Sequence, residues 1–285
     1  MPVVVITDSS SRLPNELRER WAIRQVPLHV LLDGSDLRDG VDEIPDDIYE
    51  RGEASTAAVA PAELCAAYRQ ALADSDGDGV VAVHISAALS GTVSAAETTA
   101  AEFGDAVRVV DSKSAAMGTG FVSLAAARAA AEGADLAIVQ QAARAAAQRC
   151  HAFVVVHRLD NLRRSGRMGG AAAWLGTALS LKPLLHIDDG ELVLAQRVRT
   201  ASKAVAAMLD RVCELVGDNA AAVAVHHVTN PDGAADVAAA LAERLPAGRP
   251  AIVTDLGPVL GLHVGPGALA VCVAVDTEDP GSSSA

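Results

Sequence analysis

Aromatic residues are scarce in this chain of 285 residues, since Phe, Trp and Tyr together make up 2% of it. Proteins that bind single-stranded nucleic acid stack bases on such side chains, so the sequence offers little material for that surface. Basic residues are also too few to balance the acidic ones, and the formal net charge is −13 at pH 7. That charge opposes attraction to phosphate backbones and anionic membranes. We therefore expect no nucleic-acid partner.

Cysteine motifs are missing as well. The four cysteines form no CxxC pair and no cluster with histidine; they are Cys65, Cys150, Cys213 and Cys272. This wide spacing indicates neither a zinc site nor a disulfide framework. We expect no metal site, and buried free thiols in a reducing compartment.

No segment is typical of a leader peptide or a membrane span. The opening residues, MPVVVITDSS, lack a basic start and become polar after six residues, unlike a signal peptide. The longest uncharged run, Leu256 to Val275, contains two prolines and four glycines, so we expect a loop followed by a strand there. We expect a cytoplasmic protein without stable membrane insertion.

The first half of the chain alternates short β-branched runs with alanine-rich segments. The runs, each followed by polar residues, are Val3–Ile6, Val80–Val83 and Val107–Val110. The predicted helices are Pro61–Ala73, Thr92–Phe103, Gly118–Glu132 and Leu136–Cys150. This alternation predicts an α/β fold with a mainly parallel sheet flanked by helices. Ligands of such sheets lie beyond the carboxyl ends of the strands. The polar residues expected there are Asp8, Ser9, Ser86, Ser90, Asp111 and Ser114.

The alternation restarts in the second half with a strand at Phe153–Val156. Asp189-Gly190 joins the runs KPLLHID and ELVLAQRV, which predicts a β-hairpin. The other predicted elements are helices Ser202–Val216 and Asp232–Leu245 and strands Ala221–His226, Ala251–Thr254 and Ala268–Val275. The length also favours about two domains. We predict α/β domains over residues 1–151 and 152–276, with a disordered tail at 277–285.

Familiar catalytic and nucleotide-binding signatures are missing, because the chain contains neither GxSxG nor GxxxxGK[ST]. Gly118-Thr119-Gly120 resembles part of a dinucleotide fingerprint but lacks the third glycine, so close helix packing is the favoured interpretation. His226 and His227 are neighbours on a predicted strand and point to opposite faces. We therefore expect a satisfied polar role for them rather than joint metal binding.

The most specific polar motif is HISAALSGTVSAAE at residues 84–97, which places Ser90-Gly91-Thr92 at a helix start. Free backbone N–H groups and the helix dipole suit an anion there, although Ser and Thr are also ordinary helix caps. Thr56 precedes another predicted helix, and His263 lies in a Gly/Pro-rich segment that we expect to be a loop. Together these residues would form a polar head for an apolar cleft.

Basic residues are concentrated between Arg158 and Arg211, where nine Lys and Arg outnumber five Asp and Glu. Such a run is often only a solvated face. In so acidic a chain, a docking surface or a phosphate-facing patch around Arg167, Arg199 and Lys203 is an equal alternative.

Five blocks of sequence, taken in order, match one known family. They are ITDSSSRLP, HISAALSGTVSAA, VVDSKSAAMGTG, LDNLRRSGRMGGAAAWLGTALSLKPLLHIDDGEL and LGPVLGLHVGPGALAV. On these blocks the chain resembles the DegV family of bacterial fatty-acid-binding proteins along nearly its whole length. The resemblance implies two α/β domains that enclose one long-chain fatty acid between them.

By position, the resemblance assigns the carboxylate of that fatty acid to Ser90 and Thr56, with His263 near the head group. Gly91 and Thr92 belong to the same Ser-Gly-Thr motif. Residues 56–61 read TAAVAP where the family has Thr-Ser-Gln-Pro-Ser-Pro, so only the first and last positions of that motif are kept.

Similarity to the lipid-presenting subunit of bacterial fatty acid kinase implies a non-catalytic role in phospholipid metabolism. A partner kinase would phosphorylate the bound carboxylate to an acyl phosphate, and no cofactor is implied for this chain. Docking of that kinase on Arg167, Arg199 and Lys203 is a hypothesis. Two alternatives remain at this point: a serine acyl hydrolase using Ser90 and His263, oriented by Asp255, and a nucleotide-binding α/β protein.

Overall fold

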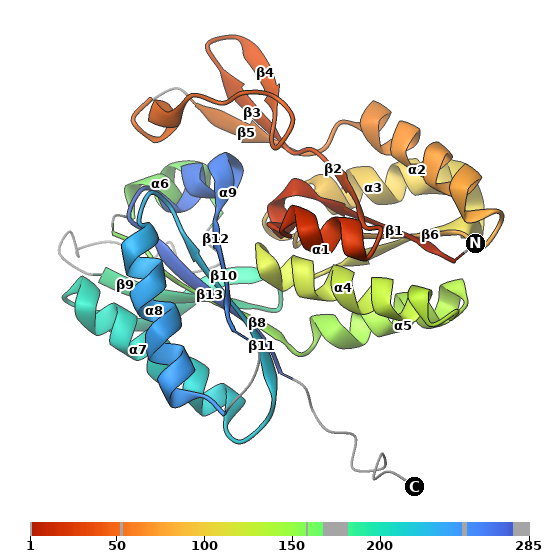
Figure 1. Cartoon of the computed structure of the whole chain (residues 1–285). Helices are drawn as coiled ribbons and strands as arrows, with labels where there is room; N and C mark the ends of the chain where they lie inside the picture. The colour runs from red at the N-terminus through yellow and green to blue at the C-terminus, as the bar shows by residue number, and fades with distance from the viewer. Residues whose placement is uncertain (1, 52–53, 158, 168–181, 247–249, 276–285) are drawn as a thin grey trace, which may run out of the picture.

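The computed structural model describes residues 2–51, 54–157, 159–167, 182–246 and 250–275 (Figure 1). Sheet A, in the first half, is parallel throughout with strand order β2-β1-β6-β7. Its strands are β1 (Val4–Asp8), β2 (Arg24–Val26), β6 (Val80–His84) and β7 (Val107–Asp111). The helices of this half are α1 (Asn15–Arg20), α2 (Pro61–Ser75), α3 (Thr92–Ala100), α4 (Met117–Ala131) and α5 (Leu136–Ala147). This confirms the predicted α/β class with a mainly parallel sheet flanked by helices.

Both faces of sheet A are covered, which explains why its two central strands, β1 and β6, contain unbroken hydrophobic runs. Successive side chains of a strand point to opposite faces. Accordingly Val5 packs in the core that contains α4 and α5, whereas Ile6 packs in the core that contains α2 and α3.

The second half contains sheet C, with strand order β10-β9-β8-β13-β11-β12. Its strands are β8 (Cys150–Val155), β9 (Lys182–Asp188), β10 (Glu191–Val198), β11 (Ala221–His227), β12 (Ile252–Asp255) and β13 (Leu269–Val275). Only the β11–β12 pair is parallel, and β9 and β10 form the predicted hairpin. The helices described in this half are α6 (Asp160–Ser165), α7 (Ala201–Val216), α8 (Pro231–Arg244) and α9 (Gly257–Val264).

Helix α4 lies between sheets A and C and is buried on nearly all sides (Figure 1). Two glycines allow this close packing. A Cβ added at Gly118 would lie 1.9 Å from Ser114 Oγ, and one at Gly120 would lie 2.9 Å from the Ser11 carbonyl oxygen. The GTG segment therefore serves helix packing, as predicted, and its geometry is explained without a nucleotide.

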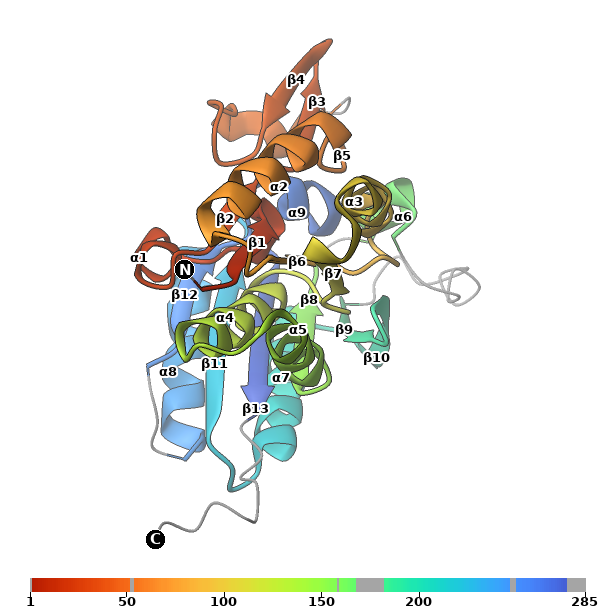
Figure 2. The same ribbon diagram turned by 90° about the vertical axis from the view of Figure 1, so that its right-hand side faces the viewer.

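Three short strands form a separate antiparallel sheet, sheet B, that the sequence patterns did not predict. Its order is β4-β3-β5, with β3 at His29–Leu32, β4 at Ser35–Arg38 and β5 at Ser55–Ala57. Sheet B projects above sheet A and contacts α9, which lies beneath it in Figure 2. Thr56 lies on β5 opposite Val30, so the position of sheet B fixes the position of Thr56.

A buried histidine holds sheet B against α2. His29 Nε2 lies 2.7 Å from Glu63 Oε2, and His29 Nδ1 lies 2.6 Å from Asp36 Oδ1. Burial by itself lowers the pKa of His29, but the hydrogen bonds and charges of the two carboxylates outweigh it and raise the pKa above 6.5. The imidazole of His29 therefore links β3, β4 and α2 through its two carboxylate partners.

Several expected boundaries were wrong. Cys150, expected at the end of a helix, begins β8, because α5 ends at Ala147. Phe103 lies in a 3₁₀-helix (Ala101–Ala106) that follows α3, with a non-helical Gly104 inside it. Further 3₁₀ turns occur at Ser9–Ser11 and Asp46–Tyr49. The expected loop around His263 is helix α9.

The predicted domain boundary at residues 151 and 152 falls inside β8, and the predicted tail at 277–285 lies outside the described residues. Among the described residues, none of the helices combines the length and the apolar character needed to cross a bilayer.

Candidate functional site

A pocket with about 950 Å³ of empty space, including the part open to solvent, lies between the two halves of the chain. The first half contributes Leu28, Ile85 and Ala115, and the second half contributes Phe153, Leu192 and Ala270. Most of the lining is aliphatic, and small side chains just before α4 and on β8 and β13 give the pocket its room; these are Ala115, Ala116, Ala152 and Ala270. The arrangement suits an elongated apolar ligand.

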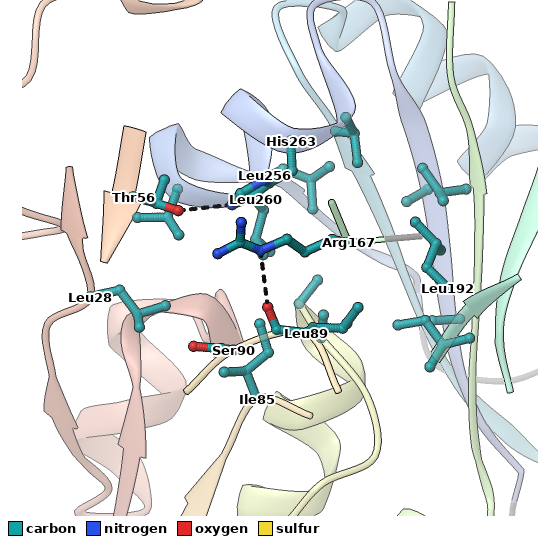
Figure 3. A pocket seen from close by; sticks show the side chains of 18 of the residues that line it. Leu28, Thr56, Ile85, Leu89, Ser90, Arg167, Leu192, Leu256, Leu260 and His263 are labelled. Atoms are coloured by element: carbon teal, nitrogen blue, oxygen red, sulfur yellow. Dashed lines mark hydrogen bonds between the residues drawn. The ribbon is translucent and has the colours of Figure 1, made fainter. Parts of the chain in front are cut away.

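One end of the pocket is polar. Thr56, Ser90, Arg167 and His263 all line it, and they come from β5, the loop before α3, the residues after α6, and α9. Figure 3 shows Leu192 across the pocket from this polar group. Three of the four were predicted as site residues, and the structure brings them together.

Ser90 stands at the end of a tight turn. The backbone N–H groups of Leu89 and Ser90 both donate to the Ser86 carbonyl oxygen, at 3.0 Å each. Gly91 follows as the N-cap of α3 and lines the pocket. Thr92 is buried outside the lining, where its backbone N–H donates to Ser90 Oγ at 3.3 Å and its hydroxyl lies 2.9 Å from the same atom. Thr92 therefore orients Ser90.

His263 is neutral at pH 7, because burial and then the charge of Arg167 lower its pKa to about 4. Its Nε2 lies 2.9 Å from Thr56 Oγ1, and its Nδ1 is buried without a partner in the described structure. A buried N–H without an acceptor costs more than a bare ring nitrogen, so the hydrogen is favoured on Nε2. His263 then donates to Thr56, whose own hydroxyl hydrogen is free to donate into the pocket.

Arg167 is the residue that sequence reasoning placed differently. The hypothesis grouped it with Arg199 and Lys203 as a docking surface or a phosphate-facing patch; the structure places it in the pocket lining, where its Nε donates to the Leu89 carbonyl oxygen at 3.4 Å. The left-handed Gly166 that ends α6 turns the chain at this point. Figure 3 shows the guanidinium directed toward the space between Thr56 and Ser90. A count of charges along the sequence does not distinguish an arginine in a pocket from one on the surface.

Arg199 is exposed just before α7, Lys203 is exposed in the first turn of α7, and neither belongs to the pocket lining. Whether they bind a partner stays a hypothesis.

The carboxyl ends of sheet A gather buried polar groups, as predicted. Asp8 Oδ2 accepts the backbone N–H of Ile85 at 2.9 Å and lies 3.0 Å from His84 Nδ1. Ser86 Oγ donates to the Gly190 carbonyl oxygen at 2.8 Å, and Lys113 Nζ lies 3.5 Å from Asp189 Oδ1. These contacts anchor the β9–β10 hairpin of the second half to the strand ends of the first.

The hydrolase alternative needs a hydrogen-bonded chain of Ser90, His263 and Asp255. In the structure each has another partner: Ser90 bonds to Thr92, His263 bonds to Thr56, and Asp255 Oδ1 accepts the backbone N–H of Gly257. The nucleophile–base–acid chain is therefore not assembled.

Of the histidine pair, His226 makes a structural contact. His226 is buried and accepts the backbone N–H of Met117 through Nε2 at 3.2 Å. The cysteines are free; Cys272 is buried in the pocket wall, whereas Cys65, Cys150 and Cys213 are only half-buried, contrary to expectation. Within the described ranges, three or more His, Cys, Asp or Glu side chains nowhere converge as metal ligands would.

Comparison with known proteins shows to which family the chain belongs. The family described as "Uncharacterised protein, DegV family" matches residues 2–276. A DegV domain-containing protein of Mycobacterium tuberculosis strain H37Rv is 70% identical over 280 residues, which are 98% of this chain and 100% of that protein. The chain belongs to the DegV family.

Two solved DegV structures are similar over nearly their full length. One is a DegV family protein from Thermus thermophilus described by its fatty acid binding: it is 35% identical, with 97% of this chain and 100% of that chain covered and a TM-score of 0.89. The other is DegV from Bacillus subtilis, described as a fatty acid binding protein: it is 28% identical, with coverage of 97% and 100% and a TM-score of 0.87.

Proposed function

We propose that this DegV protein binds one long-chain fatty acid, buries its acyl chain in the pocket and holds its carboxylate with Ser90 and Thr56. The observation that carries the proposal is a pocket between the two halves of the chain that has aliphatic walls and one polar end. The fatty acid binding described for the Thermus thermophilus and Bacillus subtilis proteins supports it.

Burial of the acyl chain supplies most of the affinity. At about 0.8 kcal/mol per CH₂, some ~14 methylenes contribute a gross free energy of roughly 11 kcal/mol. Lost translational freedom and chain ordering remove several kcal/mol of that gain. The head group therefore sets the orientation of the ligand more than the tightness of binding.

The carboxylate needs donors once it leaves water, because an unpaired buried charge is costly. The hydroxyls of Thr56 and Ser90 supply charge-assisted hydrogen bonds, and the guanidinium of Arg167 lies at the same end of the pocket. His263, being neutral, acts by orienting Thr56 rather than as an ion-pair partner.

Removing the Ser90 hydroxyl tests this head-group assignment. For Ser90→Ala we expect palmitate to bind about tenfold more weakly, since one hydrogen bond to a charged group contributes about 1.5 kcal/mol or more. Binding of hexadecanol, which carries no charge, should change less than twofold. Titration calorimetry on delipidated protein measures both.

Ser94→Ala is the matched control, because Ser94 is exposed on α3 and does not line the pocket. Mass spectrometry of lipid extracted from the purified wild-type protein tests the ligand class directly. If the extract contains no fatty acid and the delipidated protein does not bind palmitate, the proposal is wrong.

We further propose that the protein presents the bound carboxylate to a partner kinase. One carboxylate oxygen would attack the γ-phosphorus of ATP held by that kinase, the bond to ADP would break, and acyl phosphate and ADP would result. The exposed Arg199 and Lys203 are the proposed docking residues. Their charge stands out on a chain of net charge −13.

Reversing these two charges tests the docking step. For Arg199→Glu/Lys203→Glu we expect at least tenfold slower acyl-phosphate formation with the kinase, with unchanged palmitate affinity, since neither residue lines the pocket. Arg211→Glu, exposed at a later position of α7, is the control. Unchanged turnover of the double variant would contradict the docking proposal and leave the binding proposal intact.

A further inference from the structure

His29 is buried on β3, and each nitrogen of its ring faces a carboxylate. Its side chain is only 8% exposed. Nε2 lies 2.7 Å from Glu63 Oε2, and Nδ1 lies 2.6 Å from Asp36 Oδ1. An ionised carboxylate accepts hydrogen bonds but donates none, so both contacts are hydrogen bonds only when both ring nitrogens carry hydrogen. The geometry therefore matches the doubly protonated imidazole.

The other charges near the ring do not take over the role of that second proton. Arg38 lies opposite His29 on β4, but its guanidinium donates to both carboxylate oxygens of Asp42, at 2.9 Å each. Burial opposes the charged ring, yet the hydrogen bonds and charges of Glu63 and Asp36 raise the pKa of His29 above 6.5. When the ring loses a proton, one of the two carboxylates faces a bare nitrogen and its hydrogen bond is lost.

The contacts of His29 enclose the strand that carries Thr56. His29 is followed on β3 by Val30, which lies opposite Thr56 on β5. After β5, whose three residues are uncharged, the chain enters α2, and the first turn of α2 supplies Glu63. The bond between His29 and Glu63 thus joins the strand beside Thr56 to the helix that follows it.

Thr56 is the residue through which sheet B reaches the acyl pocket. It lines the polar end together with Ser90, and its Oγ1 lies 2.9 Å from His263 Nε2, the contact drawn in Figure 3. Hydrogen bonds weaken steeply when their distance or angle departs from the optimum. A small displacement of β5 would therefore weaken the bond from the Thr56 hydroxyl to a bound carboxylate.

We propose that His29 is a positioning residue for the carboxylate of the bound lipid: its doubly protonated ring ties sheet B to α2 and so holds Thr56 at the polar end of the acyl pocket. Loss of one proton releases one of the two ties, and palmitate then binds more weakly. The inference rests on the proposed function, because its readout is the affinity of the acyl pocket for a carboxylate.

The direction of the pH dependence follows from linkage. The folded state binds the second proton of His29 more tightly than the unfolded chain does, because its pKa is raised from 6.5. The tie is therefore complete below pH 6.5 and is lost as the pH rises through the higher pKa of the folded state. Affinity for palmitate should decrease over the same window.

The test compares palmitate affinity of delipidated wild type and His29→Gln at pH 6 and pH 9. At pH 6 we expect the variant to bind about fivefold more weakly, which is part of what one charge-assisted hydrogen bond contributes. At pH 9 the two proteins should agree within about twofold, because the wild type has then lost the tie as well. Ionisation of palmitate affects both proteins equally, so the ratio of their affinities isolates His29. His157→Gln, exposed and outside the acyl pocket, should bind like the wild type at both pH values.

Two further variants separate positioning of Thr56 from a general effect on the fold. In a Thr56→Val background, His29→Gln should change palmitate affinity less than about twofold at either pH, because the hydroxyl that His29 positions is gone. Glu63→Gln keeps an oxygen that can accept from Nε2 but removes the charge, so the midpoint of its pH profile should move to lower pH. Thermal unfolding verifies that each variant is folded.

Three results would overturn the inference. The first is a ratio of wild-type to His29→Gln affinity that is the same at pH 6 and pH 9. The second is an effect of His29→Gln that persists in full in the Thr56→Val background. The third is a Glu63→Gln profile with an unshifted midpoint. Each would leave the proposed fatty acid binding standing, whereas wild-type protein that binds no palmitate at either pH would refute that proposal instead.

Discussion

Ala270→Phe is expected to abolish binding of palmitate while retaining binding of a short fatty acid such as octanoate. Ala270 lies on β13 in the pocket wall, in the same apolar cluster as Leu192. A phenylalanine ring there would occupy the space that the distal half of the acyl chain fills in the proposed complex. Losing burial of about seven methylenes costs roughly 5–6 kcal/mol of binding free energy, which is more than 1,000-fold in affinity.

Fluorescence displacement with a series of saturated fatty acids from C8 to C18 measures this shift. Ala274→Phe is the matched control, since Ala274 is half-buried on the same face of β13 and does not line the pocket. Thermal unfolding of both variants verifies that they are folded. Ala270→Phe protein that still binds palmitate with wild-type affinity would show that the acyl chain lies elsewhere.

Acidification from pH 6.5 toward pH 4 is expected to destabilise the wild type more than His226→Gln. Burial and then the charge of Arg12 lower the pKa of His226 to about 3. In the unfolded chain its pKa is about 6.5, so between these values the unfolded state binds a proton that the folded state does not. Stability therefore falls as the pH drops through this window, by about 3 kcal/mol at pH 4 on an order-of-magnitude basis.

The glutamine variant isolates this effect. Its side-chain oxygen can accept the Met117 N–H that His226 accepts at the start of α4, but it does not titrate. Urea unfolding at pH 8 gives the fixed cost of the substitution, and the same measurement at pH 4 to 6 gives the slope. Parallel stability curves for the two proteins would contradict the assignment of a neutral buried His226.

The regular elements could be predicted from sequence where hydrophobic pattern alone decides them. Three strands of sheet A, β1, β6 and β7, are rich in β-branched residues because helices cover both faces of the sheet, and the Asp189-Gly190 turn specifies the β9–β10 hairpin; the short edge strand β2 (RQV) has no such pattern and was not predicted. Sheet B could not be found this way. Its strands have three or four residues, and β4 (SDLR) has no buried side chain, so no periodicity marks it.

The site residues likewise differ in whether a local sequence pattern identifies them. Ser90 was identifiable because a Ser-Gly-Thr segment at a helix start has a local physical meaning, an anion near free N–H groups. His263 was identifiable by family resemblance, but its helix was not, because Pro258 and the glycines around it are typical of a loop. Pro258 lies in the first turn of α9, where proline is compatible with a helix. Arg167 belongs to the site only through tertiary packing, which no local pattern encodes.

Because the pocket takes its walls from both halves of the chain, a bound ligand contacts both halves and holds them together. Unfolding either half would expose the ligand, so occupancy adds its binding free energy to the stability of both halves at once. A filled molecule should then melt in one transition, at a temperature that rises with the concentration of free ligand.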